Sequence, residues 1–336
     1  MPPDPTTPRA GRAGDPPLVS VIIPAYNAAA YIGGALASVF AQTFEDYEVI
    51  VVNDGSPDTP ALERALAPYD GRIVYVEQEN RGPSGARNTA IGVARGRYVA
   101  LLDSDDEWLP EYLAEQVRMF EAEPRLDMVY ADAELFGDSS LAGKTFMEGA
   151  PSRGPVTFES LLRYESSIIT SGTVARKQAL VEAGLFDEAF VRCEDFDLWL
   201  RLAHRGGRIS YQRRVLARHR AHAESLAADA IRMVEAQVGV LEKSLRLLPL
   251  TAAQRELIER QLLNCSAQID LERGKRHFAA GEYGPAAQAL RRANDFYRSR
   301  KLRLVLWALR AAPGVLSSVA RARQKFSGRR AASGAR

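Results

Sequence analysis

The chain is organised around one stretch, Tyr98-Val99-Ala100-Leu101-Leu102-Asp103-Ser104-Asp105-Asp106, in which an apolar run ends abruptly at three carboxylates. Short apolar runs are typical of buried strands, so residues 98–102 are predicted to form one. In open α/β sheets, ligands bind beyond the carboxyl ends of the strands, where these acids stand. Asp103 and Asp105, at i and i+2 of an extended chain, would lie about 6.6 Å apart on one side. Mg²⁺ takes one or two carboxylates plus substrate phosphates, so the turn is a candidate metal site. The alternative is a solvated acidic turn in which Asp105 or Asp106 caps a helix that begins near Leu109.

Strand-like and helix-like segments alternate outward from this turn. Strands are predicted over residues 18–23, 47–52, 72–76, 98–102 and 126–130, and helices over 28–40 (capped by Asn27), 61–67, from 82 and over 109–121. The alternation predicts an α/β fold with a doubly wound, mostly parallel sheet. Beyond it we expect a loop over 132–155, a helix over 158–164, a strand over 167–175, a helix over 194–204 and a strand over 209–219.

Composition divides the 336-residue chain into four parts. Residues 1–17 are proline-rich and have no apolar core of a signal peptide, so we expect a disordered leader. Residues 18–225 hold the α/β pattern. Residues 226–298 have helical periodicity, and Gly281 breaks them into a hairpin that resembles one tetratricopeptide unit. A single unit cannot bury its own faces, so we expect it to pack on the catalytic domain or on a second copy in a homodimer.

Residues 299–336 form a basic amphipathic tail. From Arg298 to the end there are eleven Arg and Lys and no acid, whereas residues 1–297 hold the other 33 basic residues and all 42 acids, a net charge of −9. A basic tail favours an anionic partner such as a lipid surface or nucleic acid, and its Trp favours a membrane interface. The alternative is a last helix docked on the domain, with Leu302, Val305, Leu306 and Leu309 on one face and a solvated charged face opposite. No run of about 18 apolar residues exists to span a bilayer, and the two cysteines fit no metal or disulfide pattern, which suggests a reducing compartment.

Four polar turns follow predicted parallel strands and would converge on one crevice. They are Pro24-Ala25-Tyr26-Asn27, Asn53-Asp54-Gly55-Ser56, residues 80–88, and Asp103-Ser104-Asp105. Tyr26 could stack on a base, Asp54 could accept a hydrogen bond from a ring N–H, and Arg87 could meet phosphate near a helix start. The alternatives for these residues are a helix cap, a turn former, a core edge and a surface ion pair.

A second acidic site, Glu194-Asp195-Phe196-Asp197, opens a predicted helix. The helix dipole alone would explain acids there, but a carboxylate at a helix start can also serve a pocket as a general base. Gly172 would let an acceptor approach the backbone, and His222 is a candidate metal ligand or phosphate donor. No G-x-G-x-x-G, P-loop, H-E-x-x-H or G-x-S-x-G motif is present, which removes the usual dinucleotide, NTPase, zincin and hydrolase interpretations.

Six segments in order resemble the family-2 inverting, nucleotide-sugar-dependent glycosyltransferases, which have the GT-A fold. They are residues 19–27, 51–56, 80–88, 102–106, 184–188 and 194–201. The resemblance covers residues 18–225 and implies Mn²⁺ or Mg²⁺ as cofactor. It implies donor binding by Pro24, Ala25, Tyr26, Asn27, Asp54, Arg87, Asp103 and Ser104. It implies metal binding by Asp105, Asp103 and His222, with Asp195 as catalytic base and Gly172, Glu194 and Trp199 on the acceptor side. His222 is the weaker match, because His219 stands where the family often has an aromatic residue.

The expected function is therefore single-step, inverting transfer of a sugar from a nucleoside-diphosphate-sugar to a hydroxyl of a glycan or lipid-linked acceptor. We expect the protein in the cytoplasm, on the inner face of the membrane if the tail binds lipid, with no nucleic-acid partner. One alternative is a non-catalytic nucleotide-sugar-binding scaffold that uses the helical tail. Another is a nucleotidyltransferase, but those enzymes usually carry a Gly-rich loop with a basic residue after the first strand, and residues 24–27 lack it.

Overall fold

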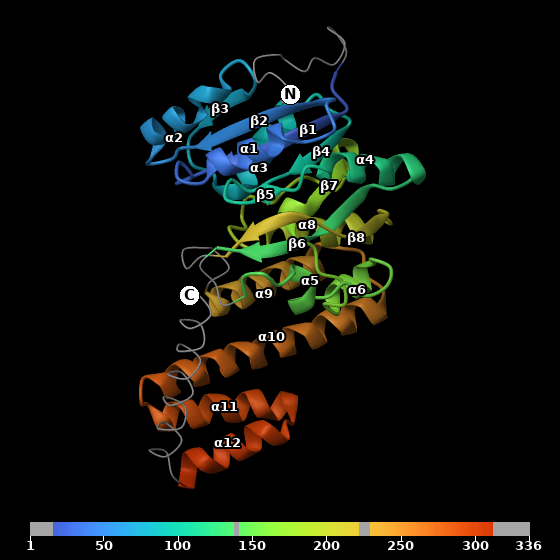
Figure 1. Cartoon of the computed structure of the whole chain (residues 1–336). Helices are drawn as coiled ribbons and strands as arrows, with labels where there is room; N and C mark the ends of the chain where they lie inside the picture. Colours follow the sequence, from blue (N-terminus) through green and yellow to red (C-terminus); the bar gives the residue numbers. More distant parts are fainter. Residues whose placement is uncertain (1–15, 138–140, 222–228, 312–336) are drawn as a thin grey trace. The chain divides into compact units, whose positions relative to one another are not determined.

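The computed structural model describes residues 16–137, 141–221 and 229–311 (Figure 1). They fall into two compact units that divide between residues 223 and 224. The expected leader up to residue 15, His222 and the tail beyond residue 311 lie outside the described residues. Each unit is considered by itself.

The first unit is built on an eight-stranded sheet in the order β3-β2-β1-β4-β7-β6-β8-β5. Its strands are β1 (Val19–Ala25), β2 (Tyr47–Asp54), β3 (Val74–Gln78), β4 (Tyr98–Leu101), β5 (Glu107–Trp108), β6 (Met128–Phe136), β7 (Thr173–Arg176) and β8 (Ile209–Arg220). Strands β1 to β4 are parallel, as expected. However, β7 lies between β4 and β6 and is antiparallel to both, so the sheet is mixed.

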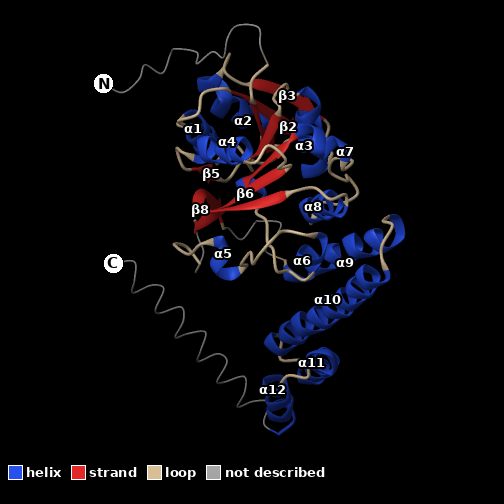
Figure 2. Ribbon diagram, turned by 90° about the vertical axis from the view of Figure 1, so that its right-hand side faces the viewer, coloured by secondary structure: helices blue, strands red, loops and turns tan. Residues whose placement is uncertain are grey.

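Helices cover both faces of this sheet. They are α1 (Ile32–Phe40), α2 (Thr59–Leu66), α3 (Gly82–Val93), α4 (Tyr112–Ala122), α5 (Phe146–Gly149), α6 (Phe158–Leu162), α7 (Lys177–Glu182) and α8 (Glu194–His204). Figure 2 shows α1 and α4 on one side of the strands and α3 and α8 on the other. Strand β1 is apolar on both faces, and its Val21, Ile22 and Ile23 are fully buried, because helices cover both faces.

Several predicted boundaries are wrong. Asn27 does not cap a helix: its φ is +52°, it lies in a turn, and α1 begins only at Ile32. The helix expected from Leu109 begins at Tyr112, because residues 107–108 pair with β8 as strand β5. The expected loop over 132–155 contains the end of β6 and helix α5. The strand expected over 167–175 is a 3₁₀ turn, residues 170–172, followed by β7.

The second unit is helical, with α9 (Ala230–Leu247), α10 (Ala252–Ala279), α11 (Tyr283–Tyr297) and α12 (Arg300–Ala311). Gly281, at φ +80°, separates α10 from α11 as predicted. Helix α12 packs on α11 of the same unit, so α11 covers the apolar face of residues 300–311. Among the described helices, none is long and apolar enough to cross a membrane.

Candidate active site

Hydrogen bonds join the turns that follow β1 and β2. The backbone N–H of Asn27 donates to Ser56 Oγ at 2.7 Å, and the N–H of Ala29 donates to Asp58 Oδ2 at 2.9 Å. Strands β1 and β2 are in register up to the pair Ala25 and Asn53, so both turns leave the sheet at the same edge. The structure thus brings the first two predicted turns together.

Asp54 connects the second turn to the third. Its side chain is buried, and its Oδ1 accepts hydrogen bonds from Gln78 Nε2 at 2.6 Å and from the backbone N–H of Arg81 at 2.9 Å. Gly55 is needed beside it, because a Cβ there would lie 2.8 Å from the backbone N of Asn80. Tyr26, by contrast, is 54% exposed and leaves its ring available at the edge of the sheet.

Arg87 joins the third turn to both acidic sites. It is on α3 and only 5% exposed. Its Nη2 lies 2.6 Å from Asp103 Oδ1 and its Nη1 lies 2.7 Å from Glu194 Oε1. Burial by itself would lower the pKa of Arg87, but the two carboxylates hold that pKa above its ordinary value. A fixed cation therefore stands between the acidic turn after β4 and the first turn of α8.

Glu194 and Asp195 differ in their surroundings. Glu194 is 8% exposed, and burial raises its pKa to about 7 although Arg87 lowers it, while the neighbouring Asp195 raises it further. Asp195 is half-buried, and its Oδ2 accepts a hydrogen bond from Thr170 Oγ1 at 2.8 Å. The start of α8 thus presents one paired, buried acid and one more accessible acid whose orientation Thr170 holds.

Asp106 is neither a helix cap nor a surface acid. It is fully buried, its Oδ2 lies 2.9 Å from His219 Nδ1, and its Oδ1 accepts the backbone N–H of Arg220 at 2.8 Å. Burial by itself would lower the pKa of His219, but the hydrogen bond and charge of Asp106, helped by Asp103 and Asp105, raise it to about 9. Arg220 Nε donates to the Asp105 carbonyl at 2.9 Å. The end of β8 therefore anchors the acidic turn.

The donor atoms around the acidic turn fit a metal that shares its coordination with a substrate. The carboxylates of Asp103 and Asp105 are both partly exposed, and Ser171 Oγ accepts the Asp103 N–H at 3.1 Å. Within residues 16–137, 141–221 and 229–311, no group of three or more His, Cys, Asp or Glu side chains could hold a metal by itself. One or two carboxylates completed by phosphates is the usual protein contribution for Mg²⁺.

Two residues expected on the acceptor side are buried. Gly172 is buried, and a Cβ there would lie 2.8 Å from the Ala131 carbonyl, so packing against β6 explains this glycine. Trp199 is 2% exposed and packs edge-on against Phe186, so its ring belongs to the core. Asp197 is structural too, since Arg201 pairs with it at 2.7 Å and also donates to the Leu185 carbonyl.

Sequence reasoning missed the support that surrounds these acids. Asn88 exchanges two hydrogen bonds with the backbone of Phe186, which fixes the segment before α8 against α3. Thr170 and the pairing of Asp106 with His219 were also missed. The available signal was the presence of Asn88, Phe186 and Asp106 in segments of the family resemblance, because nothing local pairs residues about 100 positions apart.

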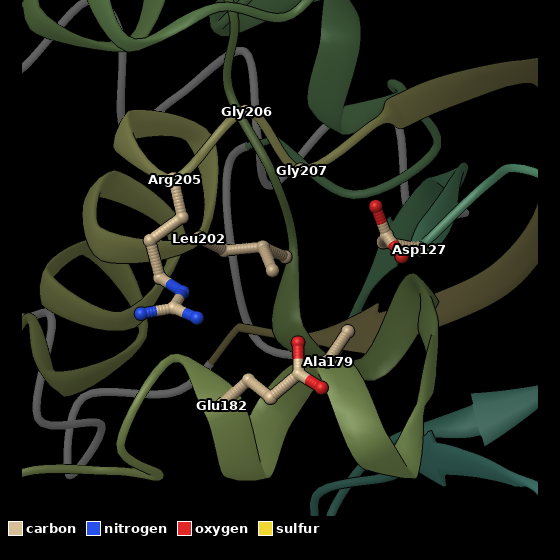
Figure 3. Close-up of a pocket in the computed structure, with 7 residues that line it drawn as sticks. All are labelled: Asp127, Ala179, Glu182, Leu202, Arg205, Gly206 and Gly207. Atoms are coloured by element: carbon tan, nitrogen blue, oxygen red, sulfur yellow. The ribbon is translucent and has the colours of Figure 1, made fainter.

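Figure 3 shows a pocket in the first unit, and none of the candidate-site residues lines it. It is lined by Asp127, Ala179, Glu182, Leu202, Arg205, Gly206 and Gly207. The N–H of Arg176 donates to the Asp127 carbonyl, and Arg176 pairs with Tyr98, the first residue of β4. The pocket therefore lies at the opposite end of β4 from Asp103.

Comparisons with known proteins agree with this geometry. The family model "Glycosyl transferase family 2" matches residues 20–172. An uncharacterized glycosyltransferase of Rickettsia prowazekii is 33% identical over 65% of this chain and 69% of its own length. The Escherichia coli UDP-Glc:alpha-D-GlcNAc-diphosphoundecaprenol beta-1,3-glucosyltransferase WfgD is 35% identical over 54% of this chain and 68% of its own length. The chain spans only 35% of a longer relative from Rickettsia felis.

Two solved structures share the fold. Staphylococcus aureus TarS residues 1–349 in complex with UDP-GlcNAc has a TM-score of 0.60 at 21% identity, with 87% of each chain covered. A mannosyltransferase from Pyrobaculum calidifontis in complex with GDP-Man and Mn²⁺ has a TM-score of 0.59 at 20% identity, with 91% of this chain and 87% of that chain covered. The fold is thus that of the GT-A-like glycosyltransferases, followed by a helical region, as expected. The matched family model and the relatives show that this chain belongs to glycosyltransferase family 2.

Proposed function

We propose that the protein transfers one sugar from a nucleoside-diphosphate-sugar to an acceptor hydroxyl with inversion of configuration. The acceptor class that we propose is a lipid-linked saccharide or a cell-surface glycan. WfgD and a second E. coli relative, WfaP, support it, because both are named for transferring glucose from UDP-Glc to an N-acetylglucosamine unit on diphosphoundecaprenol. We place the reaction on the cytoplasmic face of the membrane.

The donor would lie along the edge where the first turns meet. Tyr26, exposed at the end of β1, is proposed to stack on the base, with Pro24, Ala25 and Asn27 shaping the backbone around it. Asp54 is proposed to accept a hydrogen bond from the base. Its buried carboxylate is already oriented by Gln78 and Arg81.

The acidic turn is proposed to hold the sugar-diphosphate part of the donor. Asp103 and Ser104 would face the ribose, while Asp105, with Asp103, would hold Mn²⁺ or Mg²⁺. Bound there, the cation would neutralise charge that develops on the leaving diphosphate. His222, which lies outside the described residues, is the remaining proposed ligand.

Asp195 is the proposed catalytic base. In the proposed step the acceptor oxygen bonds to the anomeric carbon as the bond from that carbon to the diphosphate oxygen breaks, and Asp195 takes the hydroxyl proton. Glu194 is a poorer candidate, because its carboxylate is 8% exposed and is already bound to Arg87. Thr170 would keep Asp195 oriented toward the acceptor.

The observation that carries the proposal is the Arg87 bridge. One buried guanidinium contacts Asp103 on the donor side and Glu194, the direct neighbour of Asp195, on the acceptor side. A residue from the middle of α3 thus sets the position of the proposed donor acid relative to the proposed base. Such fixed positioning of two reactants is a large part of the catalysis of bimolecular transfer.

The test is release of nucleoside diphosphate from UDP-, GDP- and dTDP-sugars with Mn²⁺, in the presence of an extract of lipid-linked acceptors. We expect one donor to react and Asp195→Asn to lose transfer while donor affinity stays within a few-fold. Glu182→Gln, at the opposite end of the sheet, is the matched control and should behave as wild type. No metal-dependent release with any donor would favour the scaffold alternative, and pyrophosphate release from a nucleoside triphosphate would favour the nucleotidyltransferase.

A further inference from the structure

Helix α12 has two unlike faces. Leu306 and Leu309 are buried against Ala287 and Leu290 of α11, with Leu302 and Val305 partly buried beside them. Figures 1 and 2 both show α12 alongside α11. This is the apolar face that sequence periodicity identified as a possible membrane anchor, and α11 already covers it.

The opposite face of α12 is apolar at its centre and basic around it. Leu304 and Trp307 are 67% and 69% exposed, and Arg300 precedes them by four and seven residues on the same side of the helix. Arg303 and Arg310 are exposed along one flank. We name Arg300, Arg303, Leu304, Trp307 and Arg310 the α12 basic face.

All eleven charged residues from Arg298 to the end of the chain are Arg or Lys. No acidic residue occurs from Arg298 to the end of the chain. Exposing two large apolar side chains to water is unfavourable, whereas an anionic bilayer surface could bury them and attract the surrounding arginines. There the Trp and Leu side chains enter the headgroup boundary, and each nearby cation adds attraction.

We propose that the α12 basic face binds anionic membrane surfaces. A second copy of the chain fits this face less well, because a two-fold contact would place arginine rows of like charge against each other. The proposal does not require the transfer reaction. If the proposed function also holds, the contact would keep the enzyme at the surface where lipid-linked acceptors are found.

The experiment is sedimentation of the full chain with two kinds of vesicle, phosphatidylcholine alone and phosphatidylcholine mixed equally with phosphatidylglycerol. We expect binding to the mixed vesicles only, weakened at high salt. Trp307→Ala should reduce vesicle affinity roughly tenfold, the loss expected for one large buried apolar side chain. Arg300→Glu with Arg303→Glu should abolish it, since each lost cation costs about fivefold before the repulsion of the new acids.

Leu263→Ala is the matched control for Leu304→Ala. Leu263 on α10 is 62% exposed, but it stands among Glu256, Glu259 and Arg260 rather than in a basic field. We expect Leu304→Ala to weaken binding and Leu263→Ala to leave it unchanged. Far-UV circular dichroism and thermal melting of each variant would separate lost binding from lost folding.

Three results would overturn the proposal. The first is wild-type vesicle affinity in both Trp307→Ala and the double glutamate variant. The second is equal binding of the wild type to both kinds of vesicle. The third is a dimer in solution that Trp307→Ala and Leu304→Ala dissociate, because that face would then belong to a second copy. Release of nucleoside diphosphate without vesicles should be equal in all variants, so failure of this proposal is distinguishable from failure of the proposed function.

Discussion

Replacing Arg87 by methionine should destabilise the first unit far more than losing an ordinary ion pair. Arg87 is 5% exposed and neutralises two carboxylates at 2.6 and 2.7 Å. Removing one partner of a buried ion pair costs up to about 3–5 kcal/mol, because the remaining carboxylate must either stay charged without compensation or take up a proton. Glu194 should carry most of that cost, because its side chain is 11% exposed and that of Asp103 is 30% exposed.

The size of this effect should depend on pH. Burial raises the pKa of Glu194 to about 7 even with Arg87 lowering it, so loss of Arg87 would raise this pKa further. Above pH 7 the folded Arg87→Met variant would then hold a proton that unfolding releases. The stability of the variant should therefore fall more steeply with rising pH than that of the wild type. We expect a larger difference in unfolding free energy at pH 8 than at pH 6.

Urea unfolding followed by tryptophan fluorescence in a Trp307→Phe background would measure this in the first unit. Trp108 and Trp199 are then the only tryptophans, and both are buried in that unit. Arg208→Met is the control. It breaks an exposed pair with Glu123 at 3.5 Å and should cost at most about 1 kcal/mol.

Two further variants distinguish loss of the Arg87 ion pairs from general misfolding. Arg87→Lys keeps the charge but lacks the fork that reaches both carboxylates, so its cost should fall between those of the wild type and Arg87→Met. Adding Glu194→Gln to Arg87→Met should restore part of the loss, because the buried charge is removed. Equal costs for Arg87→Met and Arg208→Met, with no recovery in the double variant, would refute the reasoning.

Three other predictions concern the packing and charges of the same unit. In buffer with EDTA, the melting temperature should fall as pH rises from 6.5 to about 9, because folded His219 keeps its proton until about pH 9. His219→Gln should flatten this pH dependence. An unchanged pH dependence in His219→Gln would show that another group causes it. Gly172→Ala should lower the free energy of unfolding in urea by about 1–3 kcal/mol, since its Cβ would meet the Ala131 carbonyl. Gly92→Ala is the control: a Cβ there has open space on the helix, so this variant should raise the free energy of unfolding by about 0.5–1 kcal/mol. Equal effects of the two substitutions would contradict the packing argument. Asp105→Asn should lower Mn²⁺-dependent affinity for a nucleoside diphosphate at least about tenfold by calorimetry while leaving metal-free affinity unchanged, and unaltered Mn²⁺ dependence would remove Asp105 from the proposed ligands.

Local sequence patterns predicted an element correctly where the residues of that element alone determine its structure. The helix over 194–204 was predicted with the bounds that it has, because its apolar positions repeat with helical spacing and acids open its first turn. Gly281 was identified as the break between two helices, and its positive φ is one that glycine adopts easily. Strands β1, β2 and β4 followed from buried apolar runs, whereas β3, which is half-buried or exposed, begins two residues later than predicted. The predicted fold class was also confirmed, because it follows from the alternation of such strands with helices.

Local patterns failed where the answer depended on a distant neighbour. Strand β7 lies antiparallel between β4 and β6, and no period in the sequence states the order of strands. Trp199 was expected beside an acceptor but lies in the core, because an aromatic residue on a helix has the same local signal in both places. The spacing of apolar residues predicted the apolar face of α12, but only the structure shows that α11 packs against this face.

The sequence by itself determined that polar turns end a series of parallel strands, and that acids stand both after β4 and at the start of α8. It also determined the basic character of the chain after Arg298. Only the tertiary structure decided that Arg87 joins Asp103 to Glu194, that Asp106 is anchored by His219, and that α12 exposes Leu304 and Trp307. The physical reason is that composition and period are properties of neighbouring residues, whereas the partner of a charge and the cover of a face depend on chain segments that only folding brings together.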